Sequence, residues 1–293
     1  MYIYLFFKQI KRDFFIFLTV FSIMFNGSEI MNTLKIRNLT VKIDNKIILK
    51  DFNLDINSGE IHVLMGPNGI GKSTLTKVIM GDPCYEIVKG KIYYNDILLN
   101  DKSVDERSRL GIFLGMQLPM EIEGVTNADF LRSALSIRKK ENFKLFEFIN
   151  ELDDVVKLLE MDSSMIHRGI NQGFSGGERK KNEILQMFIL KPSLVMLDEI
   201  DSGLDVDSLK VVGKSIMKYF KENNPGMLLI THYQRLLDYI KPTHVHIIQD
   251  GKIIKTGDYS LVSEIEKEGF QKINNNKVTS IGTCAIKEKI KSE

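Results

Sequence analysis

The stretch that decides the fold is GPNGIGKST, which occupies residues 66–74. It fits the pattern GxxxxGK[ST], in which glycines let backbone N–H groups curl around phosphate oxygens and the following helix presents its positive end. An apolar run at 61–65 precedes it, and Leu75, Val78 and Ile79 follow with helical spacing. A strand, a phosphate-binding loop and a helix are therefore predicted in this order. The residues expected to bind the phosphates are Gly66, Pro67, Asn68, Gly69, Ile70, Gly71, Lys72, Ser73 and Thr74.

A second apolar run, at 194–197, ends in two carboxylates, Asp198 and Glu199. Four consecutive apolar residues indicate a central strand that is buried on both faces. In a phosphate site of this kind Lys72 reaches the β- and γ-phosphates, while the Ser73 hydroxyl and Asp198 hold Mg²⁺. Glu199 is then placed to polarise an attacking water as a general base. The two runs together predict a site that cleaves a phosphate bond with the help of Mg²⁺.

The sequence FSGGE at 174–178 adds a second group of glycines. Gly176 and Gly177 would expose backbone N–H groups at the start of a helix, where a γ-phosphate can dock. Ser175, with Glu178 three residues later, also fits a helix capping box. Both interpretations can hold at once, because a capped helix start still presents its glycine N–H groups.

Three further positions are singled out by their order relative to these motifs. SGLD at 202–205 follows the two carboxylates closely and includes Asp205. His232 follows the apolar run at 227–230, where it is predicted to contact the γ-phosphate or act as a switch. Gln117 lies downstream of the phosphate loop, where a glutamine that senses Mg²⁺ and the water is expected.

The wider pattern predicts an α/β fold. Strands are expected where apolar runs are bounded by turn residues, at 34–43, 61–65, 194–197, 227–230 and 244–249. Helical spacing follows the phosphate loop and recurs at 145–159 and 184–190. Strands that alternate with helices favour a mainly parallel sheet covered on both faces. The charged, helical stretch from about 125 to 168 indicates an inserted subdomain.

The composition fits one α/β domain with a smaller satellite, since the chain has 293 residues, of which 43% are hydrophobic. A formal charge of +2 gives no support for a nucleic-acid or acidic-membrane partner. Cys84 and Cys284 are too few for a disulfide framework, and without ligands near them in the sequence no cysteine metal or cluster site is expected. His62, in an apolar strand, and His167, near a loop, are expected to be structural or incidental.

The first 30 residues differ from the rest and are interpreted as a targeting leader. Basic residues precede an apolar run at 14–25, which is too short to span a bilayer but fits the core of a secretory signal. No small-x-small cleavage site follows, and a second interpretation is that translation starts at Met31. Residues 271–293 have little periodicity and are rich in Lys, Asn, Ser and Glu, which predicts a flexible tail.

Taken together, these motifs resemble the ABC ATPase cassette over about residues 34–270. Within that class the sequence is most similar to the SufC family, the ATPases of SUF iron–sulfur cluster assembly. Phe174 and Glu178 stand where transporters usually have Leu and Gln, which also favours SufC. The similar stretches lie at 111–125, 173–178, 182–187, 197–205 and 231–237 and include FSGGE, NEILQM, LDEIDSGLD and THYQRLL.

The resemblance implies a P-loop sheet core with an antiparallel β portion and a helical subdomain at about 118–180. It implies ATP and Mg²⁺ as cofactors, and SufB-like and SufD-like scaffold proteins as partners whose rearrangement hydrolysis drives. Two copies would form a transient, ATP-driven head-to-tail dimer, with each ATP between one phosphate loop and the FSGGE segment of the other copy. The residues implied to contact the other copy's nucleotide are Ser175, Gly176, Gly177 and Asp205. The implied catalytic residues are Glu199, His232 and Gln117, and the implied Mg²⁺ ligands are Ser73, Gln117 and Asp198.

Three features of the sequence leave alternatives open. Near Ile43 the aromatic residue that often stacks on adenine is replaced, so base stacking is not expected there. No stable membrane span is expected, and a separately encoded nucleotide-binding subunit of a transporter, with a partner permease, is the second hypothesis. The leader on a SufC-like ATPase implies a plastid-type, apicoplast-like organelle reached through the secretory pathway. A start at Met31 would instead imply the cytoplasm.

Overall fold

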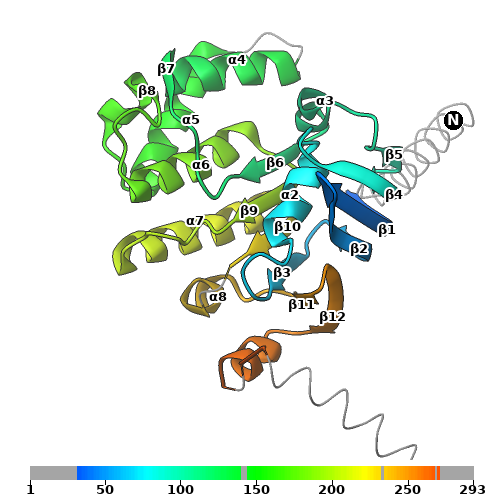
Figure 1. The fold of residues 1–293 in the computed structure, drawn as a ribbon. Coiled ribbons are helices and arrows are strands. Elements are labelled where there is room, and N and C mark those ends of the chain that lie inside the picture. The colour runs from blue at the N-terminus through cyan, green and yellow to red at the C-terminus, as the bar shows by residue number, and fades with distance from the viewer. Residues whose placement is uncertain (1–31, 140–143, 232–233, 268, 271–293) are drawn as a thin grey trace, which may run out of the picture.

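The computed structural model describes residues 32–139, 144–231, 234–267 and 269–270. Figure 1 shows a central sheet, a smaller antiparallel sheet and a lobe of helices. The expected leader at 1–30, the expected tail at 271–293 and His232 lie outside the described residues. Within the described ranges, no helix combines the length and the apolar character that crossing a membrane requires.

The central sheet has six strands in the order β12-β11-β3-β10-β9-β6, and all neighbouring pairs are parallel except β11 with β12. Every residue of β3, β9 and β10 is buried, as expected for parallel strands with both faces covered. The predicted strands at 61–65, 194–197, 227–230 and 244–249 are thereby confirmed. The six strands are β3 (Ile61–Met65), β6 (Ile112–Gly115), β9 (Leu194–Asp198), β10 (Gly226–Ile230), β11 (His244–Gln249) and β12 (Lys252–Gly257).

The second sheet, in the order β2-β1-β4-β5, is antiparallel. It consists of β1 (Thr33–Ile43), β2 (Lys46–Asn57), β4 (Glu86–Tyr94) and β5 (Ile97–Leu98). Leu34 and Ile36 of this sheet share one hydrophobic core with Leu64 of the central sheet and with Leu75 of helix α2 (Lys72–Met80). The helix that follows the phosphate loop is therefore packed against both sheets.

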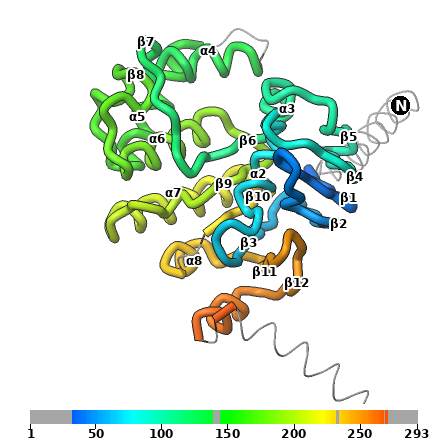
Figure 2. The backbone as a smooth tube through the Cα atoms, in the orientation of Figure 1, coloured from blue at the N-terminus to red at the C-terminus, as the bar shows by residue number. Residues whose placement is uncertain are grey.

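The lobe of helices lies between β6 and β9 in the sequence, and Figure 2 shows the chain leaving the central sheet, forming the green lobe and returning. Its elements are β7 (Ile122–Thr126), α4 (Asn127–Lys139), α5 (Leu145–Leu158), η1 (Ser163–His167), β8 (Gly169–Ile170) and α6 (Gly176–Leu190). The small antiparallel pair β7 and β8 was not predicted, whereas both predicted helical stretches are helices. Ile184 and Leu185 of α6 belong to the main core, so this helix joins the lobe to the sheet.

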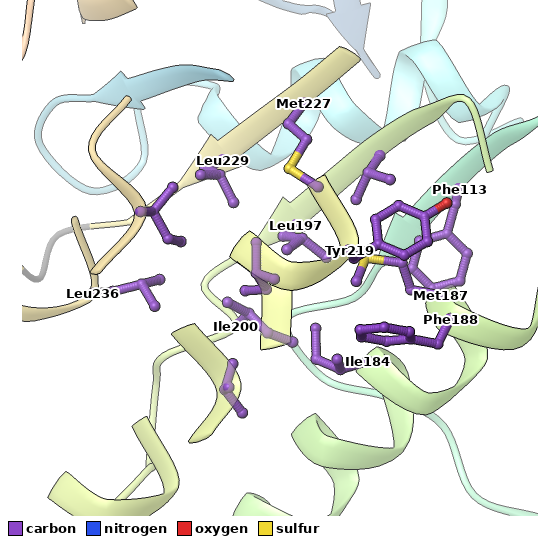
Figure 3. Packing of buried hydrophobic residues seen from close by; sticks show 14 of the residues in the cluster. Phe113, Ile184, Met187, Phe188, Leu197, Ile200, Tyr219, Met227, Leu229 and Leu236 are labelled. Carbon is purple, nitrogen blue, oxygen red and sulfur yellow. The ribbon is translucent and has the colours of Figure 1, made fainter. Parts of the chain in front are cut away.

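Helices α6 and α7 (Val206–Asn223) pack over Leu197 and Met227 of the central sheet, as Figure 3 shows. Phe188 of α6 meets Tyr219 of α7 edge-on, with ring centroids 5.3 Å apart. The buried Tyr219 hydroxyl donates to the carbonyl of Pro192 at 2.7 Å, so its polar atom is satisfied. The other labelled helices are α3 (Val104–Arg109) and α8 (Gln234–Ile240).

Candidate functional site

The loop between β3 and α2 has positive φ angles at Gly66, Gly69 and Gly71. Gly71 is the N-cap of α2 and has a φ of 104°, a conformation that an L side chain rarely adopts. A Cβ added there would also lie 2.9 Å from the Ile48 Cγ2 atom of β2. Only glycine therefore fits at this position, where the first N–H groups of α2 face the loop and favour an anion.

Lys72 lies inside the loop that it is predicted to serve. Its ammonium group donates to the carbonyl oxygens of Gly66 at 2.8 Å and Pro67 at 2.7 Å, and the side chain is buried. Burial lowers the pKa of Lys72, while the charges of Glu199 and Asp198 act in the opposite direction. A phosphate in the loop would offer this ammonium group charged oxygens in place of two carbonyls, which is the stronger kind of hydrogen bond.

Ser73 and Asp198, which the sequence predicts to share Mg²⁺, lie side by side. The Ser73 hydroxyl donates to Asp198 Oδ1 at 3.0 Å, although the two residues are 125 positions apart. Asp198 ends β9 and is buried, and burial raises its pKa, although the Ser73 hydrogen bond lowers it. One hydroxyl and one carboxylate oxygen at this distance provide the hard oxygen ligands that Mg²⁺ prefers.

Glu199 and Gln117 also meet at this edge of the sheet. Glu199 follows β9 with a φ of 48°, and its backbone N–H donates to the carbonyl of Ile230 at 2.9 Å. The left-handed backbone is uncommon for a residue other than glycine and is found often at functional sites. Gln117, which follows β6, donates from Nε2 to Glu199 Oε2 at 2.5 Å. The structure thus brings together the two side chains that are predicted to act on the attacking water.

A cavity of about 430 Å³ opens beside these residues. Ile43 and Ile48 form an apolar part of its wall, at the place where the sequence lacks the expected aromatic residue. Tyr85, which follows α2, supplies an aromatic ring to the same wall. The sequence analysis missed Tyr85 because it belongs to no motif and only the fold brings it to the cavity. The full lining is Ile43, Ile48, Asn68, Gly69, Gly71, Lys72, Ser73, Thr74, Tyr85, Gln117 and Glu199.

Met116 and Gln117, here called the Gln117 segment, are hydrogen-bonded to α6 by two charged residues that the sequence analysis did not single out. Lys180 Nζ donates to the carbonyl oxygens of Met116 at 2.9 Å and Gln117 at 2.6 Å. Glu183, one turn further along α6, accepts the Met116 N–H at 3.1 Å. Both side chains are buried, and burial raises the pKa of Glu183 to about 7. Charged residues at core positions of an otherwise apolar helix face were the signal that could have found them.

Ser175 caps α6 as predicted. Its side chain accepts the Glu178 N–H at 3.3 Å, and Glu178 in turn accepts the Ser175 N–H at 2.7 Å, which completes the capping box. A Cβ added to Gly176 would meet no atom within 4 Å, so this backbone faces open space. Neither Ser175 nor the glycines after it line the nucleotide-sized cavity of the same chain. The FSGGE segment therefore forms no part of the cavity wall in its own chain.

Asp205 and the region before His232 have structural roles in the single chain. Asp205 caps α7 by accepting the Ser208 N–H at 2.8 Å, and this hydrogen bond lowers its pKa. Thr231 precedes His232, and its hydroxyl donates to the buried Asp201. Burial raises the pKa of Asp201 to about 6. The predicted contact of His232 with the γ-phosphate falls on a residue outside the described ranges.

The fold and the site together define an ATP-binding cassette: a phosphate loop in a mainly parallel sheet, two carboxylates after a neighbouring strand, and a capped FSGGE helix. A family model for ABC transporters matches residues 49–202, which is more than half of the chain. The chain belongs to this family, and it is an ATP-binding subunit that hydrolyses ATP.

Three known proteins illustrate the relationship. Vegetative protein 296 of Bacillus subtilis (strain 168) is 52% identical over 241 residues, which cover 82% of this chain and 92% of the relative. The probable ATP-dependent transporter ycf16 of Cyanophora paradoxa is 46% identical over 257 residues, covering 85% of this chain and 97% of the relative. The dimeric structure of the ABC transporter cassette MJ0796 has a TM-score of 0.67 at 22% identity and covers 77% of this chain and 98% of the other chain. The last comparison supports the ABC cassette fold.

Proposed function

We propose that this chain is the ATPase subunit of a SUF-type iron–sulfur cluster assembly system, in which hydrolysis of ATP rearranges SufB-like and SufD-like scaffold proteins. The proposal is supported by the SufC-like stretches around FSGGE and LDEIDSGLD. These stretches carry the proposal, and an exposed apolar groove beside Gln117 provides a place where a partner protein could act directly on the catalytic site.

The groove has a volume of about 440 Å³. Leu118 and Met120 line it with 83% and 68% of their surface exposed, and Met116 lies beside them. Large apolar side chains gathered at an exposed groove mark a surface that another protein covers. Because Gln117 and Asp198 line the same groove, an occupant there would contact the segment that holds Glu199.

Mg²⁺ fits this site, because the Ser73 hydroxyl, the Asp198 carboxylate and the Gln117 amide are all oxygen donors at one edge of the sheet. When bound, the ion would neutralise charge on the β- and γ-phosphates. Lys72 would exchange the two loop carbonyls for phosphate oxygens. Glu199, released from the Gln117 amide, would accept a proton from the water that attacks the γ-phosphorus.

The second half of each site comes from another copy of the chain in this proposal. Ser175, Gly176 and Gly177 do not line the cavity of their own chain and would contact the γ-phosphate held by the other copy. Asp205, close by at the start of α7, would couple the two sites. The MJ0796 cassette, which shares this fold, is described as a dimer.

The test is ATPase activity of the chain with and without SufB-like and SufD-like proteins. We expect low basal turnover that rises when the scaffold proteins are added. Leu118→Asp should abolish the stimulation and keep the basal rate, whereas Val88→Asp, an exposed apolar residue on β4, should leave both unchanged. Turnover that ignores the scaffold proteins, in wild type and in both variants, would reject the SUF role.

The alternative is a nucleotide-binding subunit of a transporter, which fits the ycf16 relative's name, probable ATP-dependent transporter. The same groove would then hold part of a permease. Purification decides between the two, because a transporter subunit would copurify with a membrane complex that detergent releases. A SUF subunit would copurify with scaffold proteins in the absence of detergent.

We also propose a plastid-type location, for which the support is the apolar run at 14–25 together with the SufC resemblance. A reporter protein fused to residues 1–33 should enter the secretory pathway and reach the organelle. Retention of that reporter in the cytosol would exclude this location and favour a start at Met31.

A further inference from the structure

Three of the five histidines of the chain gather at one end of the central sheet. His62 of β3 and His244 of β11 are direct partners in the parallel register, and His246 lies two residues further along β11 on the same face. Glu60 immediately precedes β3 and contacts His62. The phosphate loop follows the opposite end of β3, so this cluster is separate from the nucleotide site.

A chain of short contacts joins the members of the cluster. His62 Nε2 lies 3.1 Å from Glu60 Oε2, and His62 Nδ1 lies 2.9 Å from His246 Nε2. His246 Nδ1 lies 2.9 Å from the Thr256 hydroxyl on β12. The rings of His62 and His244 are stacked, with centroids 4.4 Å apart and an interplanar angle of 23°.

The proton positions around His244 follow from its neighbour. The Thr243 hydroxyl donates its only proton to the carbonyl of Ile61 at 2.9 Å. Its oxygen can therefore only accept from His244 Nδ1, 3.0 Å away, so that nitrogen carries the hydrogen. His244 Nε2 is left with a lone pair, which is the form in which imidazole binds a metal.

The other two ligand groups are held in the same way. Glu60 accepts the Asn57 N–H at 2.8 Å, which fixes its carboxylate at the start of β3. Without an ion, His62 donates from Nε2 to the Glu60 carboxylate. On binding an ion, His62 would donate from Nδ1 to His246 instead, and His246 in turn to Thr256, which frees the Nε2 lone pair of His62. Metal-binding histidines commonly use their second nitrogen in this manner, because the hydrogen bond fixes the tautomer and the ring.

We propose that Glu60, His62 and His244 form a binding site for a divalent first-row transition-metal ion such as Zn²⁺. One ligand atom from each residue lies within 4.8 Å of the other two. Two imidazoles and one carboxylate are a donor set that suits Zn²⁺ and its neighbours, and they suit Mg²⁺ and Ca²⁺ poorly. Because the two rings are stacked, closure on an ion requires the half-exposed His244 ring to tilt toward Glu60, and a water would complete the coordination.

The surroundings allow an ion to enter. A cavity of about 430 Å³ lies over the cluster, and Asn57, Glu60, His62, His244, His246 and Thr256 are among its lining residues. His62 is buried at the base, while Glu60 and His244 are half-buried at the mouth. An ion at this point would link the starts of β3 and β11. The phosphate loop follows β3 in the sequence, and β12 follows β11.

The test is a titration of the nucleotide-free full chain with Co²⁺, followed by visible absorption, and with Zn²⁺, followed by calorimetry. All proteins carry Cys84→Ser and Cys284→Ser, so that no thiolate competes for the ion. We expect one ion per chain, with no displacement by excess Mg²⁺. The variants His244→Ala and Glu60→Gln alter half-buried side chains and should weaken binding by at least about tenfold.

The matched control is His167→Ala, which removes an exposed histidine of η1 outside the cluster and should bind as the parent does. ATP binding, measured on every variant, verifies that the fold is intact. Absence of stoichiometric Co²⁺ or Zn²⁺ binding by the parent chain would overturn the proposal. Equal binding by the parent and by His244→Ala would overturn it as well, since the ion would then lie elsewhere.

Discussion

Glu183 on α6 is a buried carboxyl, and we predict that replacing it by glutamine removes a pH dependence from the stability of the chain. Burial raises the pKa of Glu183 from 4.5 to about 7, although the Met116 N–H and the charge of Lys180 lower it. Only 7% of this side chain is exposed, so its charged form has little access to water. Ionising it in the folded state is therefore costly.

The sign follows from proton binding. In the unfolded chain Glu183 releases its proton near pH 4.5, and in the folded chain near pH 7, so between these values the folded state binds more protons. The free energy of unfolding therefore falls as the pH rises through this window. The pKa of Glu183 is raised by 7 minus 4.5, or about 2.5 units. Most of this titration falls between pH 5 and pH 8. Across that interval the free energy of unfolding should therefore fall by about 2 to 3 kcal/mol.

Glu183→Gln keeps an oxygen for the Met116 N–H but has no proton to release. The free energy of unfolding of the variant minus that of wild type should increase by about 2 to 3 kcal/mol from pH 5 to pH 8. Urea unfolding at both pH values measures this difference. Comparing the two proteins at each pH cancels the other titrating groups. The control Glu178→Gln removes a carboxylate whose pKa is lowered by its capping contacts with Ser175, so it should be destabilising at pH 8. If Glu183→Gln and wild type differ equally at both pH values, the reasoning is refuted.

Three further predictions concern the nucleotide site. Glu199→Gln should keep ATP binding and lower turnover by roughly a hundredfold or more, because the general base is removed; single-turnover hydrolysis measures this, and near-normal rates would remove Glu199 from that role. Lys72→Ala should weaken ATP binding itself, seen as a raised Kd in a fluorescent-nucleotide titration, since the ammonium group of the phosphate loop is lost. Tyr85→Ala should raise the Kd for ATP several-fold, while Tyr85→Phe should keep it, if the ring packs on the base; unchanged affinity in both would place the adenine elsewhere.

The parts of this site that the sequence predicted are those built from local patterns. The loop at 66–74 is predicted to bind phosphate through its own backbone, and the positive φ of Gly71 fits that geometry. Asp198 and Glu199 end a fully buried strand, and parallel strands bring such ends to one edge of the sheet. The capping box at Ser175 is likewise decided within four residues. Short-range geometry was sufficient in each case.

The parts that were missed depend on contacts between distant residues. Tyr85 lines the cavity only because β4 returns beside β1, and this pairing includes two irregular register shifts. The role of Lys180 and Glu183 is to hydrogen-bond the Gln117 segment, which lies more than sixty residues earlier in the sequence. His62 was expected to be structural or incidental, and its contact with His246 spans 184 positions. Local sequence patterns do not predict such contacts between residues that are distant in the sequence.

Helix α6 could couple ATP hydrolysis at the two sites of a pair of cassettes. FSGGE forms its N-terminal cap and first turn, and the next turn holds the Gln117 segment through Lys180 and Glu183. A helix of 15 residues is a rod of roughly 22 Å that moves as one piece. If a second copy's nucleotide docks at the start of α6, the turn that follows shifts the glutamine that holds Glu199. The state of the nucleotide in one copy would then alter the catalytic residues of the other, so that the two ATP sites would be coupled through α6.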